Sequence, residues 1–189
     1  MKLPIRAAVA GLALTVFVSV SAAADRPQVV VDFESLPHEY ELEGVGDIVS
    51  EHGFTFVYSP APDEPYPVGF FSVGPSWAFN LRSTALNSNS CSSTVSLVAD
   101  NSQTFSINSI DLAPLNGDEE VLVTFTGFRS RGANVSHTMR LKHSSGWKTF
   151  KFPGSFRNLE MLSWKQGDCV INKPHMFDNL VLSETSTEG

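Results

Sequence analysis

The chain has 189 residues, 42% of them hydrophobic, which is enough for one ordinary domain with a buried core. Its 20 acidic residues outnumber its 13 lysines and arginines, so the net charge at neutral pH is −7. An acidic surface repels the phosphates of nucleic acids and the head groups of anionic membranes, and the composition therefore argues against both as partners.

Residues 1–24 have the pattern of an export signal. Lys2 and Arg6 precede an apolar run over residues 7–20, and four small residues follow at 21–24. Cleavage after Ala24 leaves 11 basic against 20 acidic residues, a net charge of −9. No other stretch approaches the roughly 18 apolar residues needed to span a bilayer. The sequence therefore predicts a mature protein that is secreted or periplasmic and has no membrane span.

Nine short segments of the mature chain alternate between apolar and polar residues with a period of two, the period of a β-strand. In residues 120–128, for example, Val121, Val123 and Phe125 alternate with Leu122, Thr124 and Thr126. The nine segments are 29–34, 53–58, 93–98, 104–113, 120–128, 137–143, 147–152, 158–164 and 176–183. Turn-forming residues lie between them, and no segment has a capped helical pattern. This predicts an all-β, antiparallel sandwich of about nine strands in one domain, residues 25–183, with a disordered tail at 184–189.

The longest departure from the strand pattern is residues 59–83, which hold five prolines and five aromatic residues. Such a segment is too rich in proline for a central strand, and we expect it to fold over one face or edge of the sandwich. Sugar rings stack on exposed aromatic side chains while polar groups bind their hydroxyls. Tyr66, Trp77, Asn80 and Arg82 are therefore the candidate ligand-binding residues. Trp147 and Trp164 offer further aromatic faces, although the apolar neighbours of Trp164 favour a core position.

The two cysteines, Cys91 and Cys169, lie 78 positions apart. An even cysteine count in an oxidising compartment predicts a disulfide bond, which at this separation stabilises a fold by about 4 kcal/mol in the chain-entropy model. Two buried free thiols are the alternative. A zinc site is less favoured, because neither cysteine has a Cys or His partner at the usual spacing.

Acidic residues interrupt the first and last predicted strands. Asp178 follows Met176 and precedes Leu180 and Leu182 on one face by simple alternation, and a buried ionised carboxylate needs a counterion. Because the nearest cation in the sequence is Lys173, an oxygen-binding ion such as Ca²⁺ is a reasonable partner. The alternative is that the acids lie at strand ends in solvent or accept backbone N–H bonds.

The combination of DFE (32–34), GFTF (53–56), VTFTGF (123–128), FRNLEMLSW (156–164) and FDNLVL (177–182) resembles the secreted jelly-roll domains of bacteria and fungi. Many of these, including those with a PEP-CTERM sorting tail, have no assigned function, and this chain lacks that tail. The pattern is also similar to calcium-containing carbohydrate-binding modules, in which acids of the first and last strands share one structural ion. That resemblance implies a jelly-roll fold and Ca²⁺ ligands at Glu34 and Asp178, with Asp32 and Asn179 as weaker matches.

No motif demands catalysis. Ser76 lies in GPSWA, which lacks the second glycine of a nucleophile elbow, and the five histidines have no metal-binding spacing. Paired carboxylates for glycoside hydrolysis meet only in a fold. Three hypotheses follow: a non-catalytic domain that binds a glycan or another extracellular surface, a small polysaccharide hydrolase or lyase, or a structural envelope protein.

Overall fold

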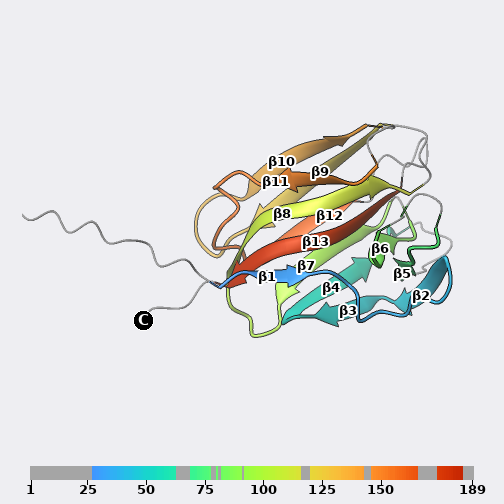
Figure 1. The fold of residues 1–189 in the computed structure, drawn as a ribbon. Helices are drawn as coiled ribbons and strands as arrows, with labels where there is room; N and C mark the ends of the chain where they lie inside the picture. Colours follow the sequence, from blue (N-terminus) through green and yellow to red (C-terminus); the bar gives the residue numbers. More distant parts are fainter. Residues whose placement is uncertain are drawn as a thin grey trace, which may run out of the picture.

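The alternating segments form two antiparallel sheets that pack face to face (Figure 1). A computed structural model describes residues 27–62, 69–77, 80, 82–90, 92–115, 120–142, 146–165 and 174–184. Within these ranges the chain forms thirteen strands. None of the described residues belongs to a helix of the length and apolar character that a membrane crossing requires.

The first sheet has seven strands and is built around the last strand of the chain. Its strands, in order, are β11 (Lys148–Lys151), β8 (Phe105–Pro114), β13 (His175–Glu184), β6 (Ala85–Ser88), β5 (Phe70–Val73) and β2 (Leu42–Gly46), with β1 (Val29–Val31) also beside β13. One edge of β13 pairs with β8 along its whole length. Its other edge pairs with β6 at the start and with β1 at the end, so β6 and β1 follow one another along it.

The second sheet has six strands. In order they are β10 (Val135–Leu141), β9 (Val121–Phe128), β12 (Met161–Lys165), β7 (Thr94–Ala99), β4 (Phe54–Ser59) and β3 (Ile48–Glu51). On β9 the buried Val121, Val123 and Phe125 face the other sheet, and Leu122 and Thr124 face outward. The alternation used in the sequence prediction is therefore the real division between core and surface.

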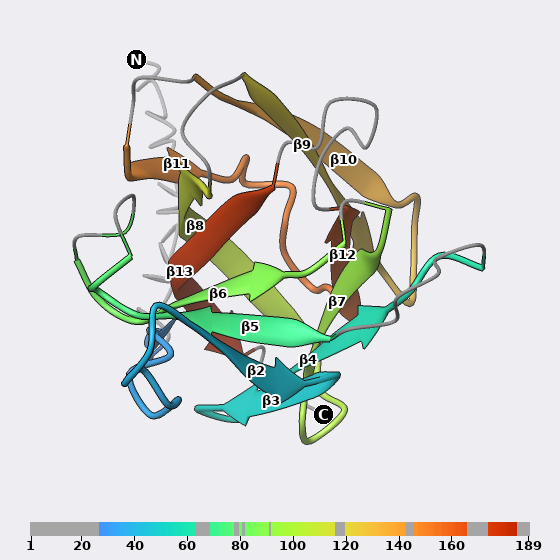
Figure 2. The same cartoon turned by 90° about the vertical axis from the view of Figure 1, so that its right-hand side faces the viewer.

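The chain passes repeatedly from one sheet to the other, as a jelly roll requires (Figure 2). From β6 to β9 each successive strand changes sheet, and the same holds from β10 to β13. The predicted all-β class and antiparallel jelly-roll sandwich are confirmed. The count of about nine strands is too low, since the structure has thirteen.

The four strands that the sequence prediction missed are β2, β3, β5 and β6. β2 contains two glycines and has no buried residue, so it shows no apolar alternation. β5 lies inside the segment 59–83 that was expected to be irregular, and all four residues of β6 are buried although two are polar. Asn87 of β6 is accommodated because its amide donates to the carbonyl of His175.

The core between the sheets is rich in aromatic rings. Trp164 is 2% exposed and lies 5.2 Å, ring centre to ring centre, from both Phe125 and Phe177. The core position expected for Trp164 is confirmed. A second, smaller apolar cluster lies apart from this core and consists of Val73, Ala85, Ala113, Leu115 and Met176, with Trp77 and Trp147 packed against it.

Candidate functional site

A β-bulge decides where Asp178 points. Asp178 pairs with Asp111 of β8, but Val181 pairs with Ser109, so β13 holds one extra residue between these two pairs. Asn179 has a φ of 49°, a left-handed conformation that asparagine tolerates better than most residues. Phe177 and Leu180 both enter the main core, whereas Met176 belongs to the second cluster. The expectation that Asp178 shares a face with Leu180 and Leu182 is therefore wrong: the bulge changes the face in between.

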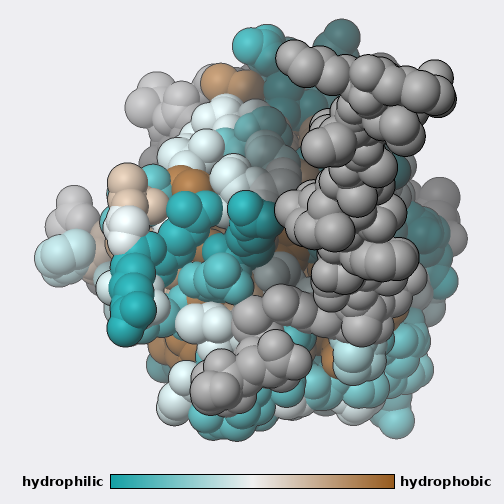
Figure 3. All heavy atoms as spheres, turned by 90° about the vertical axis from the view of Figure 1, so that its left-hand side faces the viewer, coloured by the Kyte–Doolittle hydropathy of each residue, from teal (hydrophilic) through white to brown (hydrophobic). Residues whose placement is uncertain are grey.

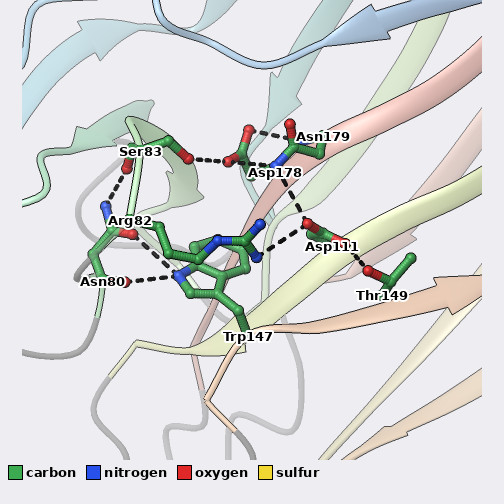
Figure 4. Close-up of polar contacts among 8 residues, drawn as sticks. All are labelled: Asn80, Arg82, Ser83, Asp111, Trp147, Thr149, Asp178 and Asn179. Carbon is green, nitrogen blue, oxygen red and sulfur yellow. Dashed lines mark hydrogen bonds and ion pairs between the residues drawn. The ribbon is translucent and has the colours of Figure 1, made fainter.

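Three polar side chains lie in one line across three strands of the seven-stranded sheet. Thr149 of β11 is paired with Asp111 of β8, which is paired with Asp178 of β13. We call this set the aspartate row (Figure 4). Residues directly opposite in an antiparallel pair have Cα atoms about 4.5–5.5 Å apart, so the row brings two carboxyl groups together. Asp111 is 5% exposed and Asp178 1% exposed.

Asp111 accepts three hydrogen bonds from three different strands or loops. The Thr149 hydroxyl donates to Oδ1 at 2.5 Å, while the Asn179 amide and the Arg82 guanidinium donate to Oδ2, each at 3.2 Å. Arg82 is thereby an ion-pair partner of a buried acid. The three donors and the positive charge offset the cost of burying this carboxyl group.

Asp178 has hydrogen-bond donors but no cationic partner among the described residues. The Ser83 hydroxyl donates to Oδ2 at 2.6 Å, and the backbone N–H of Asn179 donates to Oδ1 at 2.7 Å. Burial raises the pKa of Asp178 to about 7, and the negative charges of Asp111 and Glu34 add to that rise. Of the two carboxyl groups, Asp111 has an arginine as partner, whereas Asp178 has none and takes up a proton near neutral pH.

Arg82 and Trp147 cover the row on its solvent side. The guanidinium carbon of Arg82 lies 5.6 Å from the centre of the Trp147 ring, which is a cation–π geometry. The side chain of Arg82 is 47% exposed, so one part of it faces solvent while its Nη1 reaches Asp111. Trp147 is half-buried. Together they form a planar, charged surface with an aromatic edge, here called the Arg82–Trp147 platform.

Asn80 supports this platform from below. Its Nδ2 donates to the carbonyls of Val73, Gly74 and Ser83, at 2.8, 3.1 and 2.6 Å. In turn the indole N–H of Trp147 donates to the side-chain and backbone oxygens of Asn80. Asn80 is 1% exposed, so it holds the loop and the tryptophan in place.

The predicted ligand-binding residues therefore come together in part. Asn80 and Arg82 meet at the platform, and the half-buried Trp77 packs on the same second apolar cluster as Trp147 while its indole N–H donates to the Leu115 carbonyl. Tyr66 lies outside the described residues. That these side chains contact a ligand stays a prediction.

The two predicted calcium ligands accept hydrogen bonds from adjacent residues, Ser83 and Thr84. Glu34 accepts hydrogen bonds from the backbone N–H and the hydroxyl of Thr84, at 3.0 and 3.4 Å, and Asp178 accepts one from Ser83. Asp32, a weaker candidate, lies elsewhere: its carboxylate is grouped with Glu51 and His52, and their ligand atoms lie within 4.8 Å of one another. Asn179, the other weaker candidate, uses its amide to bridge Asp111 and Asp178.

Two other predictions fall outside the described residues. Cys91 and Cys169 are both in this category, so their disulfide bond stays a prediction. The same holds for the export signal at 1–24. The last strand, β13, continues to Glu184, one residue beyond the expected end of the domain.

Sequence reasoning missed Asp111 and Thr149. Asp111 stands in an apolar run, IDLA, as Asp178 stands in MFDNL, and this shared anomaly was the available signal. To predict that Asp111 and Asp178 are neighbours, one must know the register of β8 against β13, and no local sequence pattern gives that register.

A second concave surface lies on the outer face of the six-stranded sheet. It is a cavity of about 440 Å³ whose lining includes hydroxyl groups of Thr94, Thr124, Thr126 and Ser163, with Lys165. We call it the outer-sheet groove. Its lining combines these hydroxyl groups and one lysine with the apolar side chains of Leu122 and Phe128.

Similar solved structures are carbohydrate-binding modules. A family 29 module from Piromyces equi aligns with 87% of this chain and 94% of its own, at 14% identity and a TM-score of 0.48. The xylan-binding family 22 module from Paenibacillus barcinonensis covers 88% and 99% at 12% identity and a TM-score of 0.44. A family 32 module from Clostridium perfringens, solved with galactose, covers 71% and 98% at 12% identity and a TM-score of 0.42. No family model and no curated relative matches the chain. These similarities assign no role to any residue.

Proposed function

We propose that this chain is a secreted, non-catalytic β-sandwich domain that binds a glycan at the Arg82–Trp147 platform. The observation that carries the proposal is an exposed guanidinium that lies over an indole ring, 5.6 Å from its centre, and is bound to a buried carboxylate. Ligand sites combine a rigid aromatic surface with a few polar groups in fixed positions, and this arrangement supplies both.

The platform is preorganised, which reduces the entropy lost on binding. Arg82 is held by Asp111, and Trp147 is held by Asn80, so neither side chain must be ordered by the ligand. The guanidinium has five N–H donors. Among the described residues, one of these donors is used, in the bond to Asp111. The remaining donors suit the hydroxyl oxygens of a sugar, and the indole edge suits its apolar face.

The test is a glycan-array screen followed by affinity measurement on each hit. Arg82→Gln removes the charge and the donor fork, and we expect it to weaken binding roughly tenfold, as for loss of a charged hydrogen bond. Arg140→Gln is the matched control, because Arg140 is also an exposed arginine paired with an acid, Glu120, but lies on the other sheet. Binding that survives Arg82→Gln unchanged contradicts the proposed site and places the ligand elsewhere, the outer-sheet groove included.

Hydrolysis is a second candidate function, favoured by one observation. Asp111 and Asp178 are paired carboxyl groups in different surroundings: Asp111 is ion-paired with Arg82, and burial raises the pKa of Asp178 to about 7. Glycosidases use pairs of carboxyl groups. Both are buried beneath the platform, so a substrate has to displace Arg82 to reach them. Release of reducing sugar from any bound glycan, lost in Asp178→Asn, supports hydrolysis, and binding without release supports the non-catalytic function.

A structural calcium ion at Glu34 and Asp178 remains part of the proposal. The fit rests on the donor set: two carboxylates, with the hydroxyls of Ser83 and Thr84 beside them, are oxygen ligands of the kind Ca²⁺ prefers. Such an ion would join β1, β6 and β13 where β1 and β6 follow one another. We expect calcium to raise the melting temperature and Glu34→Gln to remove that rise. A melting temperature that is the same in calcium and in chelator contradicts the ion site.

A further inference from the structure

Three arginines converge at one end of the sandwich, away from the platform. They are Arg129 and Arg131, in the connection from β9 to β10, and Arg157, in the connection from β11 to β12. Together with Thr104, Ser130 and Asn158 they line one cavity of about 380 Å³, here called the arginine pocket. Figure 3 looks onto this end of the molecule, where hydrophilic side chains gather beside the strand ends.

Within the part of the chain that the structure describes, no ion pair neutralises the charges of this pocket. The ion pairs among the described residues involve Arg82, Arg140 and His52, and none involves the three arginines of the pocket. Three like charges around one cavity repel one another. An acidic residue beside them would reduce this repulsion, and the chain has 20 acidic residues in all. The chain as a whole has a net charge of −7, so the pocket is a local reversal of sign.

Arg129 also carries an unsatisfied donor. Its Nη2 donates to the carbonyl of Ser155, which fixes the side chain, while its Nε is buried and has no hydrogen-bond partner within the described residues. A buried donor without an acceptor destabilises a fold, and more strongly when the group is charged.

The backbone around the pocket is held by pairing between the loops. Phe105 and Leu159 form an isolated antiparallel bridge, with N–O distances of 2.9 and 2.8 Å, which ties the connection holding Arg157 to the start of β8. Glu160 N–H donates to the carbonyl of Phe128 at 2.8 Å, which ties it to the end of β9 just before Arg129. The arginines therefore project from loops whose positions are fixed relative to one another.

We propose that the arginine pocket binds an oxyanion group, a sulfate, phosphate or carboxylate, independently of the Arg82–Trp147 platform. Guanidinium groups match the geometry of such anions and bind them through paired N–H bonds. The hydroxyl of Ser130 and the amide of Asn158 are neutral donors that line the same cavity. The anion therefore meets charge from three side chains and hydrogen bonds from at least two kinds of donor.

The arginine pocket lies next to the outer-sheet groove, so one extended polymer could occupy both. The outward-facing side chains of β9 that line the outer-sheet groove extend to Phe128, and Arg129 is the next residue in the chain. An acidic polysaccharide lying along β9 would bring its charged groups to the pocket. A free inorganic anion requires only the pocket itself, and the two sources give different outcomes in the test.

The direct test is titration of the ¹⁵N-labelled protein with sodium sulfate, against sodium chloride at equal ionic strength, while the arginine Nε–Hε NMR signals are followed. We expect saturable shifts of the signals of Arg129, Arg131 and Arg157, which single Arg→Gln variants assign. Arg131→Gln and Arg157→Gln should each weaken sulfate binding roughly tenfold, the loss expected for one charged hydrogen bond. Shifts that are absent, or equal in sulfate and chloride, overturn the proposal.

Matched controls separate the pocket from net charge and from the platform. Arg140→Gln removes one positive charge elsewhere, and we expect it to leave sulfate binding within twofold; an equal loss in this variant overturns the proposal. Arg82→Gln reports on the platform alone, so failure of glycan binding and failure of anion binding are observed separately. Dextran sulfate that binds much more tightly than inorganic sulfate, with unmodified dextran inactive, identifies a sulfated polymer as the source, whereas equal affinity per sulfate group identifies the free anion.

Discussion

The aspartate row and the arginine pocket each bring like charges together, but they treat those charges in opposite ways. In the row two acids are buried in the middle of a sheet, surrounded by donors, and one of them becomes protonated near neutral pH. In the pocket three cations stand on loops at a strand end, without acids, where solvent screens them. Like charges that are buried change the free energy of unfolding, whereas like charges that are exposed change it little and are available to bind a ligand. The predictions below separate these two behaviours.

The largest effect should be the pH dependence of stability through Asp178. Its pKa in the folded state, about 7, is above the unfolded value of 3.8, so between these values the folded state holds the extra proton. The contribution of Asp178 to stability is therefore fully present below about pH 4, falls by roughly 4 kcal/mol as the pH rises to about 7, and stays constant above that. Denaturant unfolding at several pH values, in chelator, measures this slope.

Asp178→Asn is the matched variant for this slope, because an amide resembles the protonated carboxyl group in shape. We expect it to unfold with little pH dependence between 4 and 8 and to be more stable than the parent chain at pH 8 in chelator. If the variant keeps the slope of the parent, the titration belongs to another group.

Asn80→Ala should be the next most damaging change. It removes the amide that binds three backbone carbonyls and the oxygen that accepts from Trp147, which leaves buried groups unsatisfied. We expect a loss of about 2–3 kcal/mol in the free energy of unfolding. Asn89→Ala, at an exposed asparagine of the connection from β6 to β7, is the control and should change stability by less than about 0.5 kcal/mol. Equal losses in both variants would show that Asn80 does not brace the platform.

Arg82→Gln should cost about 1 kcal/mol, a modest amount for an ion pair with a buried acid. The arginine is 47% exposed, and solvent screening reduces what the pair contributes. Its loss also leaves Asp111 with two donors instead of three. Thermal unfolding near pH 7 measures the effect. A loss of several kcal/mol would mean that the platform is a structural clamp rather than a surface held ready for a ligand.

The smallest effect belongs to the arginine pocket. Arg131→Gln and Arg157→Gln remove exposed charges that repel one another, so stability should stay within about 0.5 kcal/mol or rise slightly. Added sulfate should raise the melting temperature of the parent chain by binding to the folded state, and this rise should be smaller in both variants. A clear destabilisation by Arg157→Gln without sulfate would show that the arginine is a structural part of its loop.

How much the sequence revealed depended on whether a feature is local. The nine alternating strands were predictable because burial of one face is recorded in neighbouring residues, as on β9. β6 was not, because its four residues are all buried and its polar members find partners elsewhere, Asn87 at His175. The face of Asp178 was predicted wrongly because one left-handed residue, Asn179, reverses the alternation.

The candidate sites follow the same division. Arg82 and Asn80 were recognised by residue type within one segment, while their partner Trp147 was only one aromatic residue among several. Asp111 and the arginine pocket depend on which strands and loops become neighbours. Arg129 and Arg157 are far apart in the chain, and the bridge between Phe105 and Leu159 that brings their loops together has no sequence signature.

The arrangement of β1 beside β13 has a mechanical consequence. Val29 lies opposite Leu182, so the two ends of the described chain leave the domain side by side (Figure 1). A force that pulls these ends apart opens the three residue pairs of β1 one after another instead of shearing them together. The first firm resistance comes at Phe33 and Glu34, whose backbone N–H and carboxylate are bound to Glu51 and Thr84. Under tension the domain should therefore release β1 at low force while the other strands of both sheets stay paired.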